Sequence, residues 1–456
     1  MEFTIPANPF RTHGGVHAPH RKHTAKSQSV MMPPPARVVI PMSMHIGAPC
    51  APLVKVGQEV FVGQKIGEGK GFVSAPIHSS ISGKVKAVGK ITLGTGASVD
   101  AITIESDGLM TVSPEIAPPV IQAKEDFLNA VKESGLVGLG GAGFPAHVKA
   151  ASKDPLDTLL INAAECEPYL TSDNREALED GEHVLDGIFA MMQWLGIQRT
   201  IIGIESNKPE AIKHLRELIA KDSRSNNRVG VLALKARYPQ GAEKVLIKAA
   251  TNRVVPMGKL PSSVGCVVMN ITSAGFLGRY LETGIPLIEK RVTVDGSAIQ
   301  SPQNVIVPIG TQISDMITFC GGYKGEPKKI LYGGPMMGNA VFTDETPVMK
   351  TTNGVLAFNE KDATLLQSTA CIHCGFCLTV CPMNLMPTSF EQYTKVKNVE
   401  MLKSNAILNC IECGCCSYNC PAKRPLVQAI RLGKSLVRKA DADAKAKAEA
   451  QKDNQK

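Results

Sequence analysis

The sequence has no long hydrophobic run. Its most apolar stretch, Val184–Ile197, is interrupted by Asp186 and Gln193. It therefore falls short of the roughly 20 largely apolar residues that a membrane-spanning helix needs. The first fifteen residues also lack the apolar segment of a secretory signal. We therefore expect a soluble, cytoplasmic protein rather than an integral membrane protein or a secreted one.

Aromatic residues are scarce, at 5% of the 456 residues, with a single tryptophan. Glycine and proline are plentiful, with 41 and 30 residues. At roughly 100–200 residues per domain, the length predicts three or four domains. Because glycine and proline favour turns, some of these domains are expected to be rich in β-strands.

The net charge of +9 is concentrated near the two ends. Residues 1–40 carry five Lys or Arg and one Glu, and residues 421–456 carry ten Lys or Arg and four Asp or Glu. Two interpretations remain open: solvated arms, or segments that dock on an acidic partner or a membrane surface. A basic sheet or recognition helix with interleaved aromatic residues is absent, so we expect no nucleic-acid partner.

Residues 1–37 are predicted to form an extended N-terminal arm, and residues 38–110 a β-rich module. In the second range, short alternating segments such as "VKVGQEVFVGQKIG" are punctuated by glycines. This range resembles the barrel-sandwich fold of lipoyl and biotinyl carrier domains. Lys70 lies in the hairpin where those domains carry their modified lysine, but the flanking signature is missing. We therefore expect Lys70 to be unmodified and the module to be a scaffold.

Helices and buried strands alternate over residues 120–289, which predicts an α/β domain. Residues 157–164 and 199–206 are typical of buried strands, and residues 174–196 are typical of one long helix. Residues 290–345 are again β-rich, as in a β-grasp unit. A cysteine-rich segment follows at 360–425, and then a basic tail at 426–456 that we expect to be helical or disordered.

Nine of the 13 cysteines lie between Cys371 and Cys420. In a long chain without a secretory signal, such clustering indicates metal binding rather than disulfides. Two runs share the spacing C-x2-C-x2-C-x3-C-P, the pattern of bacterial ferredoxins with two clusters, in which the fourth cysteine of each run binds the other cluster. We predict two [4Fe–4S] clusters, one on Cys371, Cys374, Cys377 and Cys420 and the other on Cys410, Cys413, Cys416 and Cys381.

Zinc is the alternative for these cysteines, but zinc needs four ligands per ion and has no use for a third C-x2-C step. Cys415 is surplus to the second run. We interpret it as a bystander thiol, although it could replace Cys416 if the loop shifted. The four isolated cysteines are expected to be small buried side chains: Cys50, Cys166, Cys266 and Cys320.

A glycine-rich loop precedes the first predicted strand of the α/β domain. Gly138, Gly140 and Gly143 satisfy the pattern G-x-G-x-x-G. The dinucleotide fingerprint should follow a strand, whereas here a helix precedes the loop, so the ordinary nucleotide-binding fold is disfavoured. Small residues still let backbone N–H groups approach a phosphate, and Pro145 can open a helix that faces it. The alternative is a glycine-rich turn at a close helix contact.

Two carboxylates, Glu165 and Glu167, follow the same strand. Ligand sites of α/β proteins lie at the carboxyl ends of strands, and an acid there can bind ribose hydroxyl groups. The alternative is a solvated strand end.

In combination, these motifs resemble a known family. "GLGGAGFPAHVK" and "NAAECEP" resemble the flavin- and NADH-binding motifs of the flavoprotein subunit of respiratory complex I. "YPQGAEKVLI" and "NITSAG" resemble its later motifs, in the same order. With "FRTHGGVHAPHRKH", "PMSMHIGAPC" and "PLVKVGQEVFVGQKIGE", the chain resembles the C subunits of the Rnf (Rsx) electron-transport complex over about residues 3–430.

This resemblance implies a multidomain fold with α/β and β parts. It has an N-terminal barrel-sandwich (lipoyl-like) module and an α/β flavin- and NADH-binding core. A β-grasp (SLBB-like) domain and a C-terminal two-cluster, ferredoxin-like helical domain follow.

The resemblance also implies the residues that would bind FMN and NADH. Glycines would cradle the phosphates, Phe144 would stack near the nicotinamide, and Glu167 would bind the NADH ribose. Ala164 stands where the complex I motif has an aspartate, so one polar contact to FMN is absent or made otherwise. The full set of expected cofactor-binding residues is Gly138, Gly140, Gly141, Gly143, Phe144, Lys149, Asn162, Glu165, Glu167, Gly241, Glu243, Asn270 and Thr272.

The implied function is electron transfer between NAD(H), non-covalent FMN and two [4Fe–4S] clusters, in a protein peripheral to the cytoplasmic face of the bacterial inner membrane. Hydride transfer to a flavin needs no side-chain acid or base, so no catalytic residue is expected. The implied partners are the other Rnf subunits, both membrane-embedded and ferredoxin-type, with ferredoxin reached indirectly.

Two other functions remain open. In a soluble flavin reductase of the cobalamin-reductase type, the β-grasp unit follows the clusters, whereas here it precedes them. A ferredoxin-like carrier on an inert scaffold would have clusters but no flavin.

Overall fold

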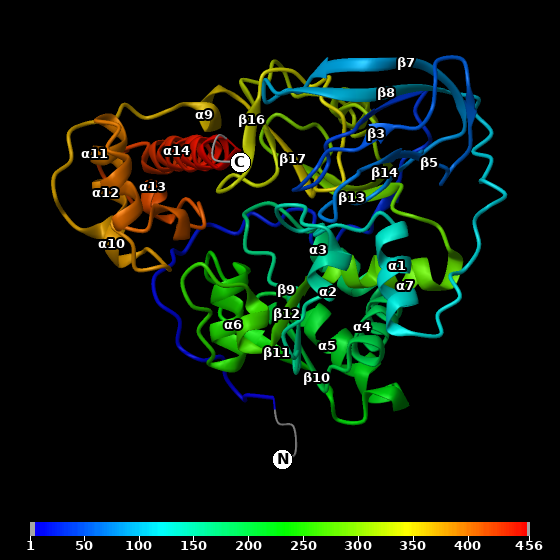
Figure 1. Cartoon of the computed structure of the whole chain (residues 1–456), viewed down its shortest axis with the longest axis horizontal. Coiled ribbons are helices and arrows are strands. Elements are labelled where there is room, and N and C mark those ends of the chain that lie inside the picture. The colour runs from blue at the N-terminus through cyan, green and yellow to red at the C-terminus, as the bar shows by residue number, and fades with distance from the viewer. Residues whose placement is uncertain (1–4, 454–456) are drawn as a thin grey trace.

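The structure is a computed structural model, and it describes residues 5–453. Figure 1 shows the parallel sheet and its helices below, two β-rich parts above, and a separate helical part at one side. No helix among residues 5–453 is long and apolar enough to cross a membrane.

The barrel-sandwich module consists of two antiparallel sheets, with strand orders β2-β8-β7-β4 and β3-β5-β6. Val38 and Ile40 lie opposite Ile104 and Ile102, and all four side chains are fully buried. Alternation of apolar and polar residues therefore places one face of this sheet in the core. The strands are β2 (Arg37–Pro41), β3 (Ala51–Pro52), β4 (Glu59–Val60), β5 (Lys65–Glu68), β6 (Ile77–His78), β7 (Gly83–Thr92) and β8 (Ser98–Ser106).

The α/β domain contains a four-stranded parallel sheet with the order β11-β10-β9-β12. Its strands are almost continuously buried, as expected for a parallel sheet covered on both faces. The strands are β9 (Thr158–Ala163), β10 (Arg199–Glu205), β11 (Val229–Leu234) and β12 (Cys266–Asn270). The helices are α1 (Lys124–Glu133), α2 (Ala146–Ala150), α3 (Ser172–Glu179), α4 (Gly181–Leu195), α5 (Pro209–Lys221), α6 (Glu243–Thr251) and α7 (Ile271–Thr283), with 3₁₀ turns η1 (Ser223–Ser225) and η2 (Pro261–Val264).

The prediction of one long helix over residues 174–196 was wrong. The chain breaks at Asp180, whose backbone angles are φ −126° and ψ 25°, so that α3 and α4 are separate helices. The Asp180 carboxylate accepts a hydrogen bond from Arg291 at 2.6 Å and pairs with Arg279 at 3.2 Å. These tertiary contacts are not visible in the local sequence pattern.

The β-grasp domain belongs to a six-stranded sheet with the order β1-β14-β13-β17-β15-β16. This sheet is wider than the segment 290–345, because β1 comes from the N-terminal arm and β17 from beyond residue 345. Its elements are β1 (Val30–Met31), β13 (Glu289–Asp295), β14 (Gln303–Pro308), β15 (Lys329–Tyr332), β16 (Asn339–Val341), β17 (Gly354–Phe358) and α8 (Ile313–Phe319).

The cysteine-rich domain is built from short helices that pack on one long helix (Figure 1). The two cysteine runs follow the same backbone path: His373 and Glu412 occupy equivalent positions and have φ of 56° and 55°. The elements are α10 (Phe376–Thr379), α11 (Pro387–Lys395), α12 (Val399–Ser404), η3 (Ile407–Asn409), α13 (Cys415–Tyr418) and α14 (Leu426–Asp453). The short helix α9 (Glu360–Ala363), predicted to open this domain, instead packs on β17 of the six-stranded sheet.

The apolar face of α14 is not free for a membrane surface, one of the docking surfaces considered for the basic C-terminal segment. Leu426, Ile430 and Val437 are buried in the core of the cysteine-rich domain. Two of its basic residues are also used internally, because Arg431 and Lys434 pair with Glu412 at 3.0 and 2.6 Å. The first half of α14 is therefore part of the cysteine-rich domain rather than a tail.

The N-terminal arm is not a solvated arm within its described part. Residues 10–31, which we call the N-terminal strap, run along the α/β domain and end as β1 at the edge of the six-stranded sheet. Lys22 anchors the strap, because its ammonium donates hydrogen bonds to the carbonyl oxygens of Glu165, Glu167 and Leu170. Burial lowers the pKa of Lys22 to about 8.

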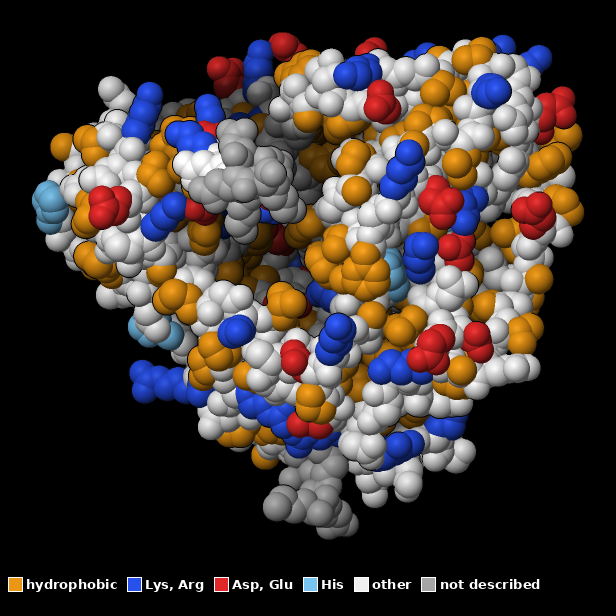
Figure 2. All heavy atoms as spheres, viewed as in Figure 1, with side chains coloured by type: hydrophobic (Ala, Val, Ile, Leu, Met, Phe, Trp, Pro, Cys, Tyr) orange, Lys and Arg blue, Asp and Glu red, His pale blue; other side chains and the backbone are white. Residues whose placement is uncertain are grey.

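Figure 2 shows one face of the molecule. Lys and Arg side chains are interspersed there with Asp and Glu, and with scattered hydrophobic side chains, rather than gathered in one basic area.

Candidate functional site

The predicted flavin-binding residues gather at the carboxyl edge of the parallel sheet. Asn162 of β9 and Asn270 of β12 are paired in register near the ends of their strands. Helices α6 and α7 begin close to this edge, at Glu243 and Ile271. Helix N-termini carry unpaired N–H groups and favour anions.

The glycine loop lies beside this edge, and its four glycines differ in what they contact. A Cβ on Gly140 would lie 2.3 Å from the Asn270 amide nitrogen, and Gly143 has φ 69° with Thr351 only 2.7 Å from the position of its Cβ. Packing therefore requires glycine at these two positions. A Cβ on Gly141 would meet no atom within 4 Å, and Gly140 to Ala142 are exposed. Phe144 closes the loop, accepting a 2.9 Å hydrogen bond from the Gly138 N–H.

Two further predicted residues form an ion pair at the same edge. The Lys149 ammonium lies 3.0 Å from the Glu243 carboxylate and donates a second, 3.4 Å bond to Val268 O. Both side chains are about one third exposed, so the lysine can exchange this partner for another anion at modest cost. Asn162 donates to Gly241 O at 2.8 Å and so fixes the turn that precedes α6.

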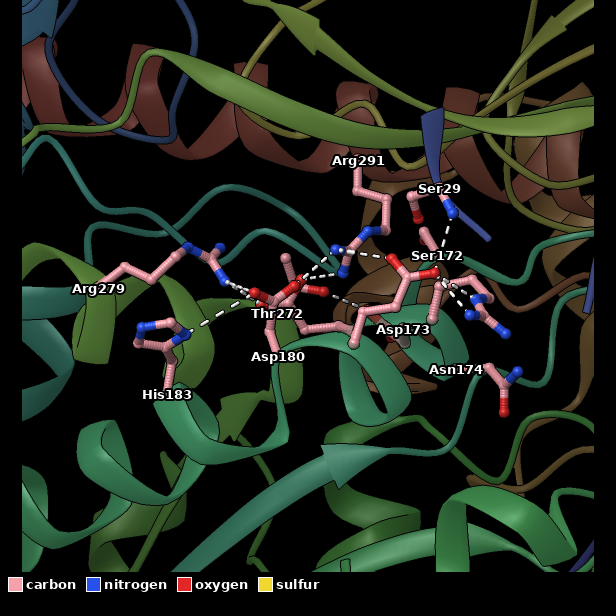
Figure 3. A network of polar contacts seen from close by, with 12 residues as sticks. Ser29, Ser172, Asp173, Asn174, Asp180, His183, Thr272, Arg279 and Arg291 are labelled. Atoms are coloured by element: carbon pink, nitrogen blue, oxygen red, sulfur yellow. Dashed lines mark hydrogen bonds and ion pairs between the residues drawn. The ribbon is translucent and has the colours of Figure 1, made fainter. Parts of the chain in front are cut away.

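Asn270 and Thr272 both contact Asp173 at the start of α3. The Asn270 amide donates to Asp173 at 2.8 Å and the Thr272 hydroxyl at 2.9 Å. Figure 3 shows Asp173 and Thr272 within the polar network that joins α3, α4 and α7. Burial, and then the neighbouring Glu165, raise the pKa of Asp173 to about 6. This carboxylate is the least suitable neighbour for a phosphate in the region.

The two acids of "NAAECEP" have different environments. Glu165 is buried, and its carboxylate accepts from the Ser172 hydroxyl at 3.1 Å and the Asp173 N–H at 2.9 Å, which satisfies the N-terminus of α3. These contacts argue against the prediction that Glu165 binds a cofactor. The Glu167 carboxylate accepts from the N–H groups of Met336 and Met337, both at 2.9 Å. Burial raises the pKa of Glu167 to about 7.

The residues present fit an FMN phosphate group. The site has a cation in Lys149, two helix N-termini and an exposed glycine stretch in which only Gly141 faces open space. Each of these features favours an anion.

The predicted cluster ligands form two separate cavities. Cys371, Cys374, Cys377 and Cys420 line one, and Cys381, Cys410, Cys413 and Cys416 line the other. The fold therefore brings the fourth cysteine of each run to the other run, as the ferredoxin pattern predicts. Backbone N–H groups already point at two sulfurs, those of Cys381 and Cys410, each at 3.3 Å. Thiolates commonly accept such bonds around iron–sulfur clusters.

The two cavities differ in their surroundings. Cys374 is exposed, whereas Cys413 and Cys416 are buried. The second cavity also includes Cys415, whose sulfur lies 3.9 Å from Tyr238 O in the α/β domain. Cys415 therefore faces the flavin-binding domain. The second cavity is the one next to that domain.

Sequence reasoning missed three groups that join the domains here. They are Gly14–Val16 of the strap, Tyr238 in the turn before α6, and the loop Gly333–Gly338 that holds Glu167. The first two lie in motifs that support the family resemblance, but nothing local indicates that distant parts of the chain meet at these points.

Four family models match the chain in the expected order. They are described as RnfC barrel sandwich hybrid domain (residues 10–109), Nuo51 FMN-binding domain (131–277), SLBB domain (291–340) and 4Fe-4S dicluster domain (370–424). These matches confirm the predicted fold class and the predicted FMN and [4Fe–4S] cofactors. The chain is thus an iron–sulfur flavoprotein, one component of an oxidoreductase.

Relatives extend this assignment over nearly the whole chain. The sequence is 44% identical to the C subunit of the Na⁺-translocating ferredoxin:NAD⁺ oxidoreductase complex of Acetobacterium woodii, covering 93% of this chain and 96% of that one. It is 42% identical to the proton-translocating counterpart of Clostridium ljungdahlii, covering 94% of each. The chain belongs to the family of C subunits of Rnf-type, ion-translocating oxidoreductase complexes. The predicted role, an electron-transfer subunit of such a complex, is confirmed.

Among solved structures, an NAD⁺-reducing [NiFe]-hydrogenase in the air-oxidised state overlaps with 69% of this chain and 64% of the hydrogenase chain, with a TM-score of 0.49 and 20% identity.

Proposed function

We propose that this protein passes electrons between NAD(H) and its partner subunits through FMN at the carboxyl edge of the parallel sheet and two [4Fe–4S] clusters in the cysteine cavities. The cysteine arrangement carries this proposal, because each cavity is lined by the four cysteines that the pairing rule requires. FMN, when bound, supplies the exchange between a two-electron hydride and one-electron carriers.

The residues of this chain bind and orient FMN and NADH and shield them from water. Lys149 and the glycine loop hold the flavin phosphate, and Asn270 and Thr272 join them by exchanging their bonds to Asp173 for bonds to the phosphate. Asn162 holds the Gly241 turn against the flavin. Glu167 binds the NADH ribose. A carboxylate that accepts two parallel N–H bonds is also suited to a ribose diol, which presents two hydroxyl donors. Glu165 supports α3 instead.

The remaining parts of the proposal concern partners and location. The protein lies peripherally at the cytoplasmic face of the membrane and contacts membrane-embedded and ferredoxin-type subunits, with ferredoxin as an indirect partner. Ion movement takes place in those partners. The names of relatives support this placement, because they describe ion-translocating ferredoxin:NAD⁺ oxidoreductase complexes.

The test is an anaerobic titration of the full chain loaded with FMN and iron–sulfur clusters. Addition of NADH should bleach the flavin band and the broad iron–sulfur band. An unchanged spectrum in fully loaded protein would contradict the NADH site.

Two matched cysteine variants test the cluster ligands separately. Cys420→Ser should lose the signal of one cluster, because it removes one of four ligands from the first cavity. Cys415→Ser should keep the iron content and both reduced-cluster EPR signals. Loss of a cluster in Cys415→Ser would reassign the second site.

A further inference from the structure

The N-terminal strap crosses between the α/β domain and the cysteine-rich domain at Gly14–Val16 (Figure 1). On the side of the α/β domain, Val16 and Tyr238 exchange two backbone hydrogen bonds of 2.7 and 3.0 Å. The Arg237 guanidinium adds a 3.0 Å bond to Gly15 O. Three hydrogen bonds thus attach these residues to the turn that precedes α6.

The same residues contact the second cluster cavity. The Gly15 N–H donates to Val380 O at 2.8 Å. The α-carbon of Gly14 faces the peptide bond between Cys381 and Pro382. Cys381 is a predicted ligand of the second cluster, so the strap lies directly against the backbone of one ligand.

The two glycines leave no space for a side chain. A Cβ on Gly14 would lie 2.6 Å from the Cys381 carbonyl carbon, and one on Gly15 would lie 2.7 Å from Tyr238 O, whereas ordinary contacts begin at 3.4 Å. Both glycines also have positive φ, 63° and 87°. Any larger residue would push the cysteine-rich domain away from the turn.

We propose that Gly14 and Gly15 are positioning residues that set the spacing between the flavin-binding turn and the second cluster cavity. The turn, which runs from Arg237 to Ala242, contains Gly241 and is held to β9 by Asn162. The strap is therefore a backbone spacer between the two predicted cofactor sites, beside the direct contact of Cys415 with Tyr238 O. This inference rests on the proposed function, because the spacing matters only if electrons cross it.

The rest of the strap makes such a spacer rigid. Lys22, six residues after Val16, is bound by three carbonyl oxygens in the loop after β9, and Tyr169 N–H donates to His20 O at 2.9 Å. Before the glycines, Phe10 N–H donates to Ala249 O at 2.8 Å. A strap fixed on both sides cannot absorb an added methyl group by sliding.

Gly14→Ala in the full chain, loaded with FMN and both clusters, tests the proposal by stopped-flow spectroscopy. NADH should bleach the flavin at the wild-type rate, but cluster reduction should slow several-fold, because electron transfer between separated cofactors weakens as the distance between them grows. Dithionite should still reduce both clusters fully. In the dithionite-reduced protein, the EPR signal of one cluster should change shape, and this measurement does not depend on NADH.

Gly258→Ala is the matched control, because Gly258 also has positive φ, 69°, but no atom lies within 4 Å of the position of its Cβ. Equal rates and unchanged EPR spectra in Gly14→Ala, Gly258→Ala and the wild type would overturn the proposal. If Gly14→Ala fails to hold its clusters, Arg237→Met is the second variant. It removes the hydrogen bond from the α/β domain to Gly15 O and should likewise slow cluster reduction. A wild-type rate in Arg237→Met would then overturn the proposal. If NADH fails to bleach the flavin of the wild-type protein, that result would instead contradict the proposed function.

Discussion

Lys350 shows how a single buried side chain joins two domains. Its ammonium nitrogen lies 2.6 Å from Pro76 O in the barrel-sandwich module and 2.7 Å from Gly135 O after α1. Burial lowers the pKa of Lys350 to about 7. A neutral amine has two hydrogens, and the two carbonyl groups use both.

The pKa of Lys350 predicts a pH-dependent stability. The unfolded chain holds this proton up to about pH 10.5, whereas the folded protein releases it near pH 7. The unfolded state therefore binds more protons between these values, and the free energy of unfolding rises with pH by up to about 1.4 kcal/mol per pH unit from this residue. In denaturant unfolding, the free energy of unfolding of the wild type should therefore rise relative to that of Lys350→Met between pH 7 and pH 10. Lys70→Met, at an exposed lysine, should show no such trend, and a flat difference for Lys350→Met would contradict the prediction.

At the residue scale, the sequence predicted which residues gather at the candidate site but did not always predict their hydrogen-bond partners. Glu165 and Glu167 are separated by one residue, and both were predicted to bind a cofactor. Only the folded chain shows that Glu165 satisfies the N-terminus of α3 while Glu167 binds the loop Gly333–Gly338. Partners that lie about 170 positions away leave no local pattern.

At the scale of elements, α14 differs most from its prediction. Residues 426–456 were predicted to be a basic tail, helical or disordered, and a helix is present. Its apolar stripe, however, is buried against α11, α12 and α13, so it completes the cysteine-rich domain. An amphipathic pattern reveals that one face will be covered but not what covers it.

Two truncations of α14 should therefore behave differently. Removing residues 442–456 should leave the iron content unchanged, because the buried side chains that the structure describes in this helix lie at or before Val437. Removing residues 426–456 should abolish both cluster signals, because it exposes the core of the domain, where each large side chain lost costs about 2–5 kcal/mol. Iron analysis and absorbance of the purified proteins measure this. Full iron content in the longer truncation would show that α14 is an appendage.

At the scale of the whole molecule, an ion network joins the α/β domain to the six-stranded sheet. Figure 3 shows Arg291 and Arg279 directed toward Asp180 at the junction of α3 and α4. Arg291 of β13 also pairs with Glu176 and, at 3.2 Å, with Glu179. The arginine and Glu176 are almost completely buried, so each charge depends on its partner.

Arg291→Met should lower the free energy of unfolding by about 3–5 kcal/mol, because it leaves buried carboxylates without their cation. Lys213→Met, which removes an exposed pair with Glu217, should change it by no more than about 1 kcal/mol. Denaturant unfolding followed by circular dichroism measures both. Similar values for the two variants would show that the network adds little to stability.

The amino-acid sequence was enough to predict β-rich and α/β segments from strand alternation and helix periodicity, and the pairing of the two cysteine runs from ligand spacing, while its resemblance to a family supplied the kinds of domain. How the domains meet became visible only in the folded chain. The strap between Tyr238 and Cys381, the loop on Glu167 and the covered face of α14 all depend on contacts between distant segments. Such contacts form wherever buried hydrogen-bonding groups and apolar faces find complementary partners in space, and no short stretch of sequence encodes both members of the pair.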